Sequence, residues 1–187
     1  MKSLETKKVI RKQILYKRDC LTSEQKEAAE IKIFQNIISL KEFQEAQCIL
    51  LYANKGSEVS TEMLLMESFE RKKEVYFPRV LNETEMEFYR IRSRDDLRVG
   101  SYQIKEPVTN VPYSISRKTF MILPMTAFDN KRNRLGYGKG YYDRYLSKTE
   151  NIYTCGIAFE CQRWEEILPV DRYDYPLATI VTESHIY

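Results

Sequence analysis

Apolar residues follow two alternating patterns along the chain. Short runs of strand length occupy residues 47–53, 73–80, 86–92, 119–125, 152–159 and 178–183. Segments whose apolar residues have the spacing of amphipathic helices lie before these runs and between several of them. Strands that alternate with helices predict an α/β fold, specifically a three-layer α/β/α domain with a largely parallel (mixed) central sheet.

The N-terminal segment has a helical pattern with two different faces. Ile10 and Ile14 lie on one face, while Lys7, Arg11 and Arg18 share another. This segment is therefore predicted to be an amphipathic helix with cations along one side.

A second helix is predicted over residues 22–40. Thr22 and Gln25 have the spacing of a capping box. The apolar stripe of this helix is formed by Ile31, Phe34 and Ile38. We interpret it as a helix that packs on the core and has no chemical role. Further helices are expected at 61–72 and 140–148.

Length and composition indicate a single domain that spans residues 1–187. A compact fold of this length removes roughly 70% of its unfolded surface from water, so it needs no disulfide or metal to hold it together. The hydrophobic fraction of 43% is ordinary for a globular protein. No internal repeat or low-complexity linker divides the chain.

No segment has the length of a transmembrane helix. The longest uncharged stretch, residues 119–128, is about half as long as a helix that crosses a bilayer. The N-terminal residues are charged throughout and lack the apolar core of a signal peptide. We therefore expect a cytoplasmic protein with no membrane partner.

Cysteine and histidine contribute little candidate chemistry. Cys20, Cys48, Cys155 and Cys161 have no metal-ligand spacing, and His185 is the sole histidine. This argues against zinc clusters and histidine-based triads. The cysteines are interpreted as reduced thiols that mostly fill the core.

Positive charge is concentrated in two distant segments. Residues 1–20 and residues 116–146 each carry seven Lys or Arg and two Asp or Glu, a net of +5 each. Because the whole chain has a net charge of +3, the remainder carries −7. One anion site built from both segments explains this distribution, and two separate solvated faces explain it equally well.

The glycine-rich stretch RLGYGKGYYDRYL, residues 134–146, holds three of the six glycines, namely Gly136, Gly138 and Gly140. A strand, a glycine-rich loop and a helix together form the arrangement in which backbone N–H groups bind phosphate. The spacing matches neither GxxxxGK[ST] nor GxGxxG. A tight surface turn explains three glycines about as well as a phosphate loop.

The charged neighbours of these glycines favour phosphate chemistry. Arg134 and Lys139 supply positive charge, and Asp143 lies one helical turn after Lys139. Lysine for phosphate and aspartate for Mg²⁺ are the residue types that phosphoryl transfer needs. The alternative for Asp143 is an ordinary i,i+4 salt bridge with Lys139. Ligands bind at the carboxyl ends of parallel strands, so the loops at 54–60, 125–140 and 159–176 are expected to converge.

The motif FDNKRNRLGYGKGYYDRYL resembles the 5-formyltetrahydrofolate cyclo-ligase family, also called methenyltetrahydrofolate synthetases. The segments KKVIR, SEVST, IKEP and QRWEEILPVDRYD follow the family in order and spacing, from residue 7 to about residue 183. The RLGxGKGYYD core is the specific part of this likeness. The resemblance implies conversion of 5-formyltetrahydrofolate to 5,10-methenyltetrahydrofolate with ATP and Mg²⁺. It implies ATP and a folate as the partners, and we expect a monomer.

The resemblance also implies roles for individual residues. The ATP-binding set is Lys7, Lys8, Arg11, Arg134, Leu135, Gly136, Tyr137, Gly138, Lys139, Gly140, Tyr141, Tyr142 and Gln162. The catalytic set is Lys139, Arg134 and Tyr142. Mg²⁺ is assigned to Asp143 and Asp174, and the folate to Ala53, Glu58, Tyr141 and Tyr142.

The chain departs from the family pattern at several positions. Arg132, Met125 and Gln103 stand where the family usually has glycine, and Tyr173 replaces a frequent histidine. If one of these glycines serves a positive φ, the loop here must turn differently or carry strain.

Two other classes of function fit parts of the pattern. A sugar-phosphate isomerase would need a carboxylate base and no ATP, and a small-molecule kinase would transfer phosphate without folate. A nucleic-acid-binding module would use the basic N-terminal helix and the many tyrosines, with affinity that falls steeply with salt. The nearly balanced charge and the two separate basic segments argue against nucleic acid as a partner.

Overall fold

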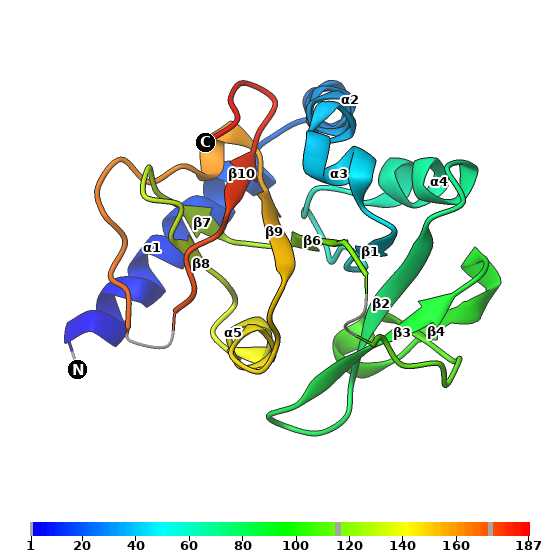
Figure 1. The fold of residues 1–187 in the computed structure, drawn as a ribbon. Helices are drawn as coiled ribbons and strands as arrows, with labels where there is room; N and C mark the ends of the chain where they lie inside the picture. The colour runs from blue at the N-terminus through cyan, green and yellow to red at the C-terminus, as the bar shows by residue number, and fades with distance from the viewer. Residues whose placement is uncertain (1, 115–116, 172–173) are drawn as a thin grey trace.

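The central sheet has six strands in the order β10-β9-β6-β1-β2-β3 (Figure 1). The computed structural model describes residues 2–114, 117–171 and 174–187. The strands of this sheet are β1 (Cys48–Leu50), β2 (Glu74–Val80), β3 (Met86–Ile91), β6 (Thr119–Leu123), β9 (Ile152–Ile157) and β10 (Thr179–Val181). Every neighbouring pair is parallel except β2 and β3, which are antiparallel. The predicted α/β fold with a largely parallel, mixed sheet is confirmed.

Helices cover both faces of the sheet, as Figure 1 shows. The helices are α1 (Lys2–Asp19), α2 (Ser23–Ser39), α3 (Lys41–Glu45), α4 (Glu62–Glu70) and α5 (Tyr141–Leu146). Helices α2, α3 and α4 pack on one face and α5 on the other. The apolar runs supply both cores because successive side chains of a strand point to opposite faces. In β1, Ile49 belongs to the core under α2, whereas Leu50 belongs to the core under α5.

Short elements that the pattern did not predict complete the fold. Two small antiparallel ribbons pair β4 (Leu97–Val99) with β5 (Lys105–Pro107), and β7 (Ala127–Phe128) with β8 (Arg134–Leu135). Three 3₁₀ helices are η1 (Arg94–Asp96), η2 (Ser101–Gln103) and η3 (Glu160–Gln162). Helix α3 was also not predicted.

The amphipathic helix α1 packs on the β7–β8 ribbon and on η3. Ile10 and Ile14 are buried together with Ala127, Leu135 and Leu168. Strand β8 forms the first two residues of the glycine-rich stretch and leads directly into Gly136. Packing on this ribbon therefore places the cationic side of α1 beside the glycines.

Helix α2 confirms the predicted cap and corrects the predicted apolar face. The Gln25 backbone N–H donates to Thr22 Oγ1 at 3.2 Å, and the Thr22 backbone N–H donates to Gln25 Oε1 at 2.9 Å. Ile31, which we placed in the buried stripe, is 43% exposed. The buried residues of this helix are Ala29, Ile33 and Ile37. Their four-residue spacing directs them at the sheet, while Phe34 and Ile38 are only partly buried.

Two of the three altered glycine positions have the backbone conformation that favours glycine. The φ angle is 62° at Arg132 and 60° at Gln103, next to 57° at Tyr102. Met125 is not among the described residues with positive φ. The loops thus adopt a left-handed conformation at Arg132 and Gln103 and carry the strain of a side chain there. Tyr173, the fourth departure, lies outside the described residues.

Candidate active site

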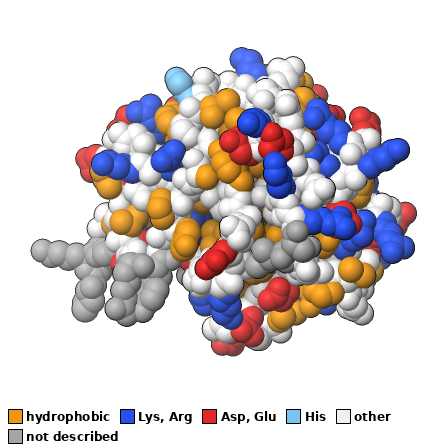
Figure 2. All heavy atoms as spheres, viewed as in Figure 1, with side chains coloured by type: hydrophobic (Ala, Val, Ile, Leu, Met, Phe, Trp, Pro, Cys, Tyr) orange, Lys and Arg blue, Asp and Glu red, His pale blue; other side chains and the backbone are white. Residues whose placement is uncertain are grey.

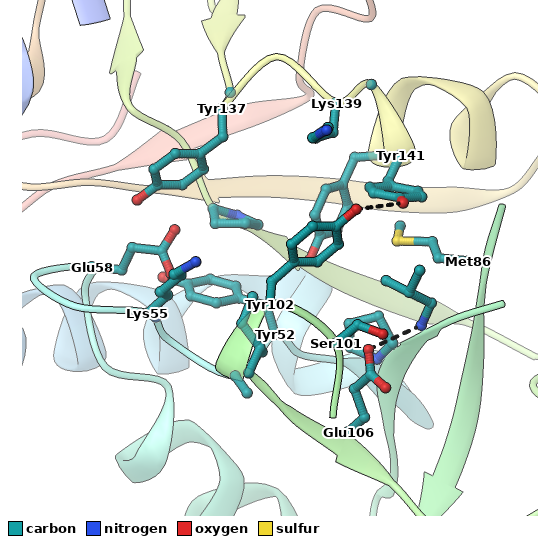
Figure 3. Close-up of a pocket in the computed structure, with 18 of the residues that line it drawn as sticks. Tyr52, Lys55, Glu58, Met86, Ser101, Tyr102, Glu106, Tyr137, Lys139 and Tyr141 are labelled. Atoms are coloured by element: carbon teal, nitrogen blue, oxygen red, sulfur yellow. Dashed lines mark hydrogen bonds between the residues drawn. The ribbon is translucent and has the colours of Figure 1, made fainter. Parts of the chain in front are cut away.

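A cavity of about 320 Å³ lies where the connections of neighbouring strands diverge. Strands β1 and β6 are parallel neighbours, but β1 continues to β2 on one side and β6 continues to β9 on the other. Such a switch point opens a crevice at the carboxyl ends of the strands. The loop after β1 and the loop after β6 both line the cavity, together with η2 and the first turn of α5 (Figure 3).

Many of the predicted site residues line this cavity. They are Ala53, Glu58, Arg134, Gly136, Tyr137, Lys139, Gly140, Tyr141, Tyr142 and Asp143. The other predicted residues do not line it, namely Lys7, Lys8, Arg11, Leu135, Gly138, Gln162 and Asp174. Lys8 is exposed, and Leu135 is buried under α1.

The glycine-rich loop needs glycine at two of its three positions. Gly138 has φ +94° and Gly140 has φ +68°. A Cβ atom on Gly138 would lie 3.2 Å from Nη2 of Arg11. Arg11 in turn donates from Nε to the carbonyl oxygen of Gly136 at 2.7 Å. Glycine therefore allows α1 to bring a guanidinium against the loop backbone.

Arg134 is buried and paired with a carboxylate. Its Nη2 lies 2.6 Å from Oδ1 of Asp143, and its Nη1 donates to the Tyr175 carbonyl at 2.6 Å. Asp143 therefore pairs with Arg134 and does not form the alternative i,i+4 salt bridge with Lys139. Lys139 Nζ instead lies 6.0 Å from the centre of the Tyr102 ring. Among the described residues, no carboxylate lies within ion-pair distance of Lys139.

Lys7 is held between two aspartates from the C-terminal part of the chain. Its Nζ lies 2.7 Å from Oδ2 of Asp171 and 2.8 Å from Oδ2 of Asp174, and its side chain is only 7% exposed. Burial lowers the pKa of Lys7, but hydrogen bonds and charge interactions with both carboxylates outweigh it and raise the pKa overall. The loop at 159–176 thus reaches the basic helix, and Tyr175 joins it to Arg134 and Asp143, but none of its described residues lines the cavity with the other two loops.

Glu58 is a buried carboxylate at the cavity wall. Its Oε2 accepts a hydrogen bond from the Lys55 backbone N–H at 2.6 Å. Burial raises the pKa of Glu58, while the Lys55 amide, the Tyr137 hydroxyl and the Arg18 charge act in the opposite direction. Burial, the largest cause, together with the nearby Glu58 charge raises the pKa of the Tyr142 hydroxyl, so this group stays protonated.

The cavity also contains residues that the sequence did not single out as site residues. Lys55, Tyr102 and Glu106 all line it. The Tyr102 and Tyr141 hydroxyls are 3.2 Å apart, and Figure 3 shows the two rings meeting at one side of the cavity. Glu106 is the acidic residue of the IKEP segment, and the match of that segment to the family pattern could have identified it as a site residue. Lys55 in the loop after β1 and Tyr102 in η2 have no distinguishing sequence pattern around them.

Gln162 is enclosed in the protein and all of its polar atoms are used internally. Its Nε2 donates to the carbonyls of Met125 and Thr126 at 2.8 Å and 2.9 Å. Its Oε1 accepts from the Phe159 backbone N–H at 2.9 Å. The side chain thus connects η3 by hydrogen bonds to the segment that follows β6.

Replacing Gln162 with alanine should therefore lower the free energy of unfolding by about 2–4 kcal/mol, because two carbonyls and one N–H lose their partners. Urea unfolding followed by circular dichroism measures this change. Gln35→Ala on the exposed side of α2 is the matched control, with an expected change below about 0.5 kcal/mol. Equal stability of the two variants would contradict this structural role.

The fold places a charged cavity at the switch point of the sheet, where α/β enzymes commonly bind their ligands. The sequence profile of the 5-formyltetrahydrofolate cyclo-ligase family matches residues 3–183. The chain belongs to this family of ligases, which act on folate in one-carbon metabolism. Membership of this family implies that the enzyme uses ATP.

Individual relatives and solved structures agree with this assignment. The 5-formyltetrahydrofolate cyclo-ligase of Haemophilus influenzae is 34% identical, over 92% of this chain and 95% of its own length. The Escherichia coli K12 enzyme of the same name is 28% identical, over 93% and 98%. The solved structure of Aquifex aeolicus 5,10-methenyltetrahydrofolate synthetase superposes with a TM-score of 0.84 at 35% identity, covering 96% of this chain and 91% of that one. Among the described residues, no helix has the length and apolar character needed to cross a bilayer.

Proposed function

We propose that the chain converts 5-formyltetrahydrofolate to 5,10-methenyltetrahydrofolate in an ATP- and Mg²⁺-dependent reaction that releases ADP and phosphate. The observation that carries this proposal is the cation Lys139, which no described carboxylate pairs with, on a cavity that is also lined by five tyrosines and Glu58. The tyrosine rings suit a flat pterin, and the carboxylate suits its N–H donors. The fixed positive charges suit a transferring phosphoryl group.

The chemical difficulty lies in the formyl oxygen, which is a very poor leaving group. In the proposed reaction the formyl oxygen of the N5 amide accepts the γ-phosphoryl group of ATP, and ADP leaves. N10 of the folate then attacks the same carbon and loses its proton. The carbon–oxygen bond breaks, and phosphate departs with that oxygen. The protein needs to align the two substrates and neutralise charge, which requires no histidine.

The proposed roles follow from where the side chains lie. Lys139 stabilises the transferring phosphoryl group, and Arg134 shares this role from the cavity wall. Tyr142 lines the cavity with a protonated hydroxyl that can donate a hydrogen bond to the substrate. Lys7 and Arg11 lie one helical turn apart, with Arg11 against the glycine-rich loop and Lys7 against Asp174, and we assign both to the remaining phosphates.

The two aspartates fit a magnesium site that is completed by phosphate. Mg²⁺ commonly takes one or two carboxylates and fills its other positions with water and substrate phosphates. Asp143 and Asp174 meet this need, and no cluster of three or more His, Cys, Asp or Glu suited to a metal occurs in the described part of the chain. The Tyr175 backbone N–H lies 3.4 Å from Oδ1 of Asp143, which brings the backbone that directly follows Asp174 to the first carboxylate. When bound, the ion would neutralise charge on the phosphates.

Both carboxylates are paired with cations that we assign to the phosphates, namely Asp143 with Arg134 and Asp174 with Lys7. When Mg²⁺ and ATP bind together, the metal pairs with the two aspartates and the phosphates pair with the two cations. ATP alone would leave the aspartates without a cation, and Mg²⁺ alone would leave Arg134 and Lys7 without an anion. We therefore expect ATP to bind about tenfold more tightly when Mg²⁺ is present. Calorimetric titration of ATP with Mg²⁺ or with a chelator measures the effect, and adenosine is the control. Equal ATP affinities would contradict the proposed exchange of partners.

Nucleic acid is a poor alternative partner because key cations of α1 are not on the surface. Lys7 is 6% exposed and Arg18 is 3% exposed. On the face shown in Figure 2, Lys and Arg side chains are mixed with Asp and Glu and do not form a basic strip. ATP and a folate therefore remain the proposed partners.

The test of the proposed function is an assay of the purified chain with 5-formyltetrahydrofolate, ATP and Mg²⁺. Absorbance of the methenyl product in the near ultraviolet should rise only when all three are present. A kinase would consume ATP without forming this product, and a sugar-phosphate isomerase would consume no ATP. Absence of product from well-folded protein would overturn the proposal.

A further inference from the structure

Arg18 is a buried cation that contacts two separate loops of the site. It lies near the C-terminal end of α1 and is 3% exposed. Its Nε donates to Ser57 Oγ at 2.9 Å, and its Nη2 donates to the Tyr137 hydroxyl oxygen at 2.9 Å. Its Nη1 is buried and has no hydrogen-bond partner among the residues that the structure describes. Arginine is almost never fully buried unless it is paired, so this placement requires an explanation.

The two contacts of Arg18 lead to the same carboxylate. Ser57 directly precedes Glu58 and also contacts Asp19. Tyr137, from the glycine-rich loop, has a hydroxyl that accepts a hydrogen bond from Arg18 and also interacts with the Glu58 carboxylate. Figure 3 shows the Tyr137 hydroxyl and the Glu58 carboxylate pointing toward each other. Arg18 itself is not a lining residue of the cavity.

We propose that Arg18 is a positioning residue that holds Glu58 and Tyr137 as one unit and keeps the Glu58 carboxylate in its charged form. This proposal rests on the proposed function, in which Glu58 accepts hydrogen bonds from the folate. Arg18 contacts the loop after β1 through Ser57 and the glycine-rich loop through Tyr137, so it holds these two loops in a fixed position relative to each other.

The surroundings of Glu58 explain why it needs such support. The groups that face it are Lys55 in its own loop, Tyr52 at the end of β1, Tyr137 in the glycine-rich loop, Tyr142 in α5 and Arg18 in α1. Lys55 is exposed and Arg18 is buried, so the charge of Arg18 is less screened by water. Tyrosine hydroxyls stabilise a carboxylate only through hydrogen bonds. Arg18 is thus the one buried full positive charge among these groups.

The direction of the pH effect follows from these contacts. Burial already raises the pKa of Glu58, and loss of the Arg18 charge would raise it further. Below that pKa the carboxyl group is protonated and is a poorer acceptor for N–H donors. The KM for the folate should therefore rise as the pH falls, and recover as the pH rises.

Initial rates of the full chain, measured with both substrates from about pH 6 to about pH 9, test this inference. Arg18→Met should raise the KM for the folate about tenfold near pH 7, with recovery toward the wild-type value at high pH. Its kcat and its KM for ATP should change far less. Arg18→Lys keeps the charge and should largely restore the pH profile. Lys17→Met on the exposed side of α1 is the matched control.

Tyr137→Phe supplies a second test that keeps the charge of Arg18 in place and removes one of its hydrogen-bond partners. It should produce a smaller rise in the folate KM with the same pH dependence, because Glu58 loses its interaction with the hydroxyl. A folate KM that rises equally at every pH in Arg18→Met would overturn the inference. If Arg18→Met does not fold, a pH-independent KM in Tyr137→Phe would overturn it instead.

Glu58→Gln separates failure of this inference from failure of the proposed function. If wild type makes product and Glu58→Gln leaves the folate KM unchanged, the proposed folate role of Glu58 is wrong. If Glu58→Gln raises the folate KM and Arg18→Met does not, only the role of Arg18 is wrong.

Discussion

Replacing Lys139 with methionine should lower kcat by about 10²–10³-fold, the loss typical for removal of one group that stabilises transition-state charge. Methionine keeps the length of the aliphatic stem and removes the ammonium. Lys139 lines the cavity, and among the described residues no carboxylate pairs with it. Its charge is therefore available to a phosphoryl group, whereas Lys7 and Arg134 must first leave their aspartates.

Stability should distinguish this catalytic loss from a folding defect. Lys139 is exposed, so Lys139→Met should change the free energy of unfolding by less than about 0.5 kcal/mol. Lys131→Met, in the exposed loop before β8, is the matched control and should keep full activity. Lys139→Arg should recover part of the rate, because it restores charge with a different shape. Wild-type kcat in Lys139→Met would contradict the assignment.

Replacing Asp143 with asparagine should reduce kcat/KM by about 10²-fold, because a bound metal contributes several kcal/mol to charge stabilisation. The change removes one carboxylate of the proposed magnesium site and keeps its size. Asp174 remains, so high Mg²⁺ concentrations should restore part of the activity. The measurement is the Mg²⁺ dependence of the initial rate.

The same change should also destabilise the protein, since Arg134 loses its partner at 2.6 Å and its side chain is only 4% exposed. An uncompensated buried cation of this kind costs about 1–3 kcal/mol when its partner is partly exposed, as Asp143 is. Asp95→Asn, on the exposed 3₁₀ helix η1, is the control for both measurements. A variant that loses stability but keeps the wild-type Mg²⁺ dependence would show that Asp143 only pairs with Arg134.

Local sequence patterns correctly predicted those elements that are determined by a few neighbouring residues, such as buried strands and a helix cap. The continuous apolar runs at 47–53 and 119–125 became buried central strands, and Thr22 and Gln25 formed the expected cap. The face of α2 was predicted wrongly because two overlapping apolar stripes run along this helix. The choice between them depends on where the sheet lies. Strands of two residues, such as β7 and β8, leave no detectable pattern in the sequence.

In the candidate site, too, residues that share one motif could be predicted from the sequence, whereas contacts between distant residues could not. Arg134, Lys139 and Asp143 share one motif, so their common location could be predicted. The pairing of Lys7 with Asp171 joins residues 164 positions apart, and no local pattern indicates it. Arg18 was predicted only as a member of a cationic helix face, because burial depends on which loops fold over it. The resemblance to a known family supplied the roles of Glu58 and Asp174, which single residues do not indicate.

The most direct test of the central claim follows the formyl oxygen. 5-Formyltetrahydrofolate labelled with ¹⁸O in the formyl group is converted by the chain with unlabelled ATP and Mg²⁺, and the released phosphate is analysed by mass spectrometry. Phosphorylation of the formyl oxygen predicts that one ¹⁸O atom per turnover appears in inorganic phosphate. Unlabelled phosphate, with the ¹⁸O recovered in water, would contradict the proposed mechanism.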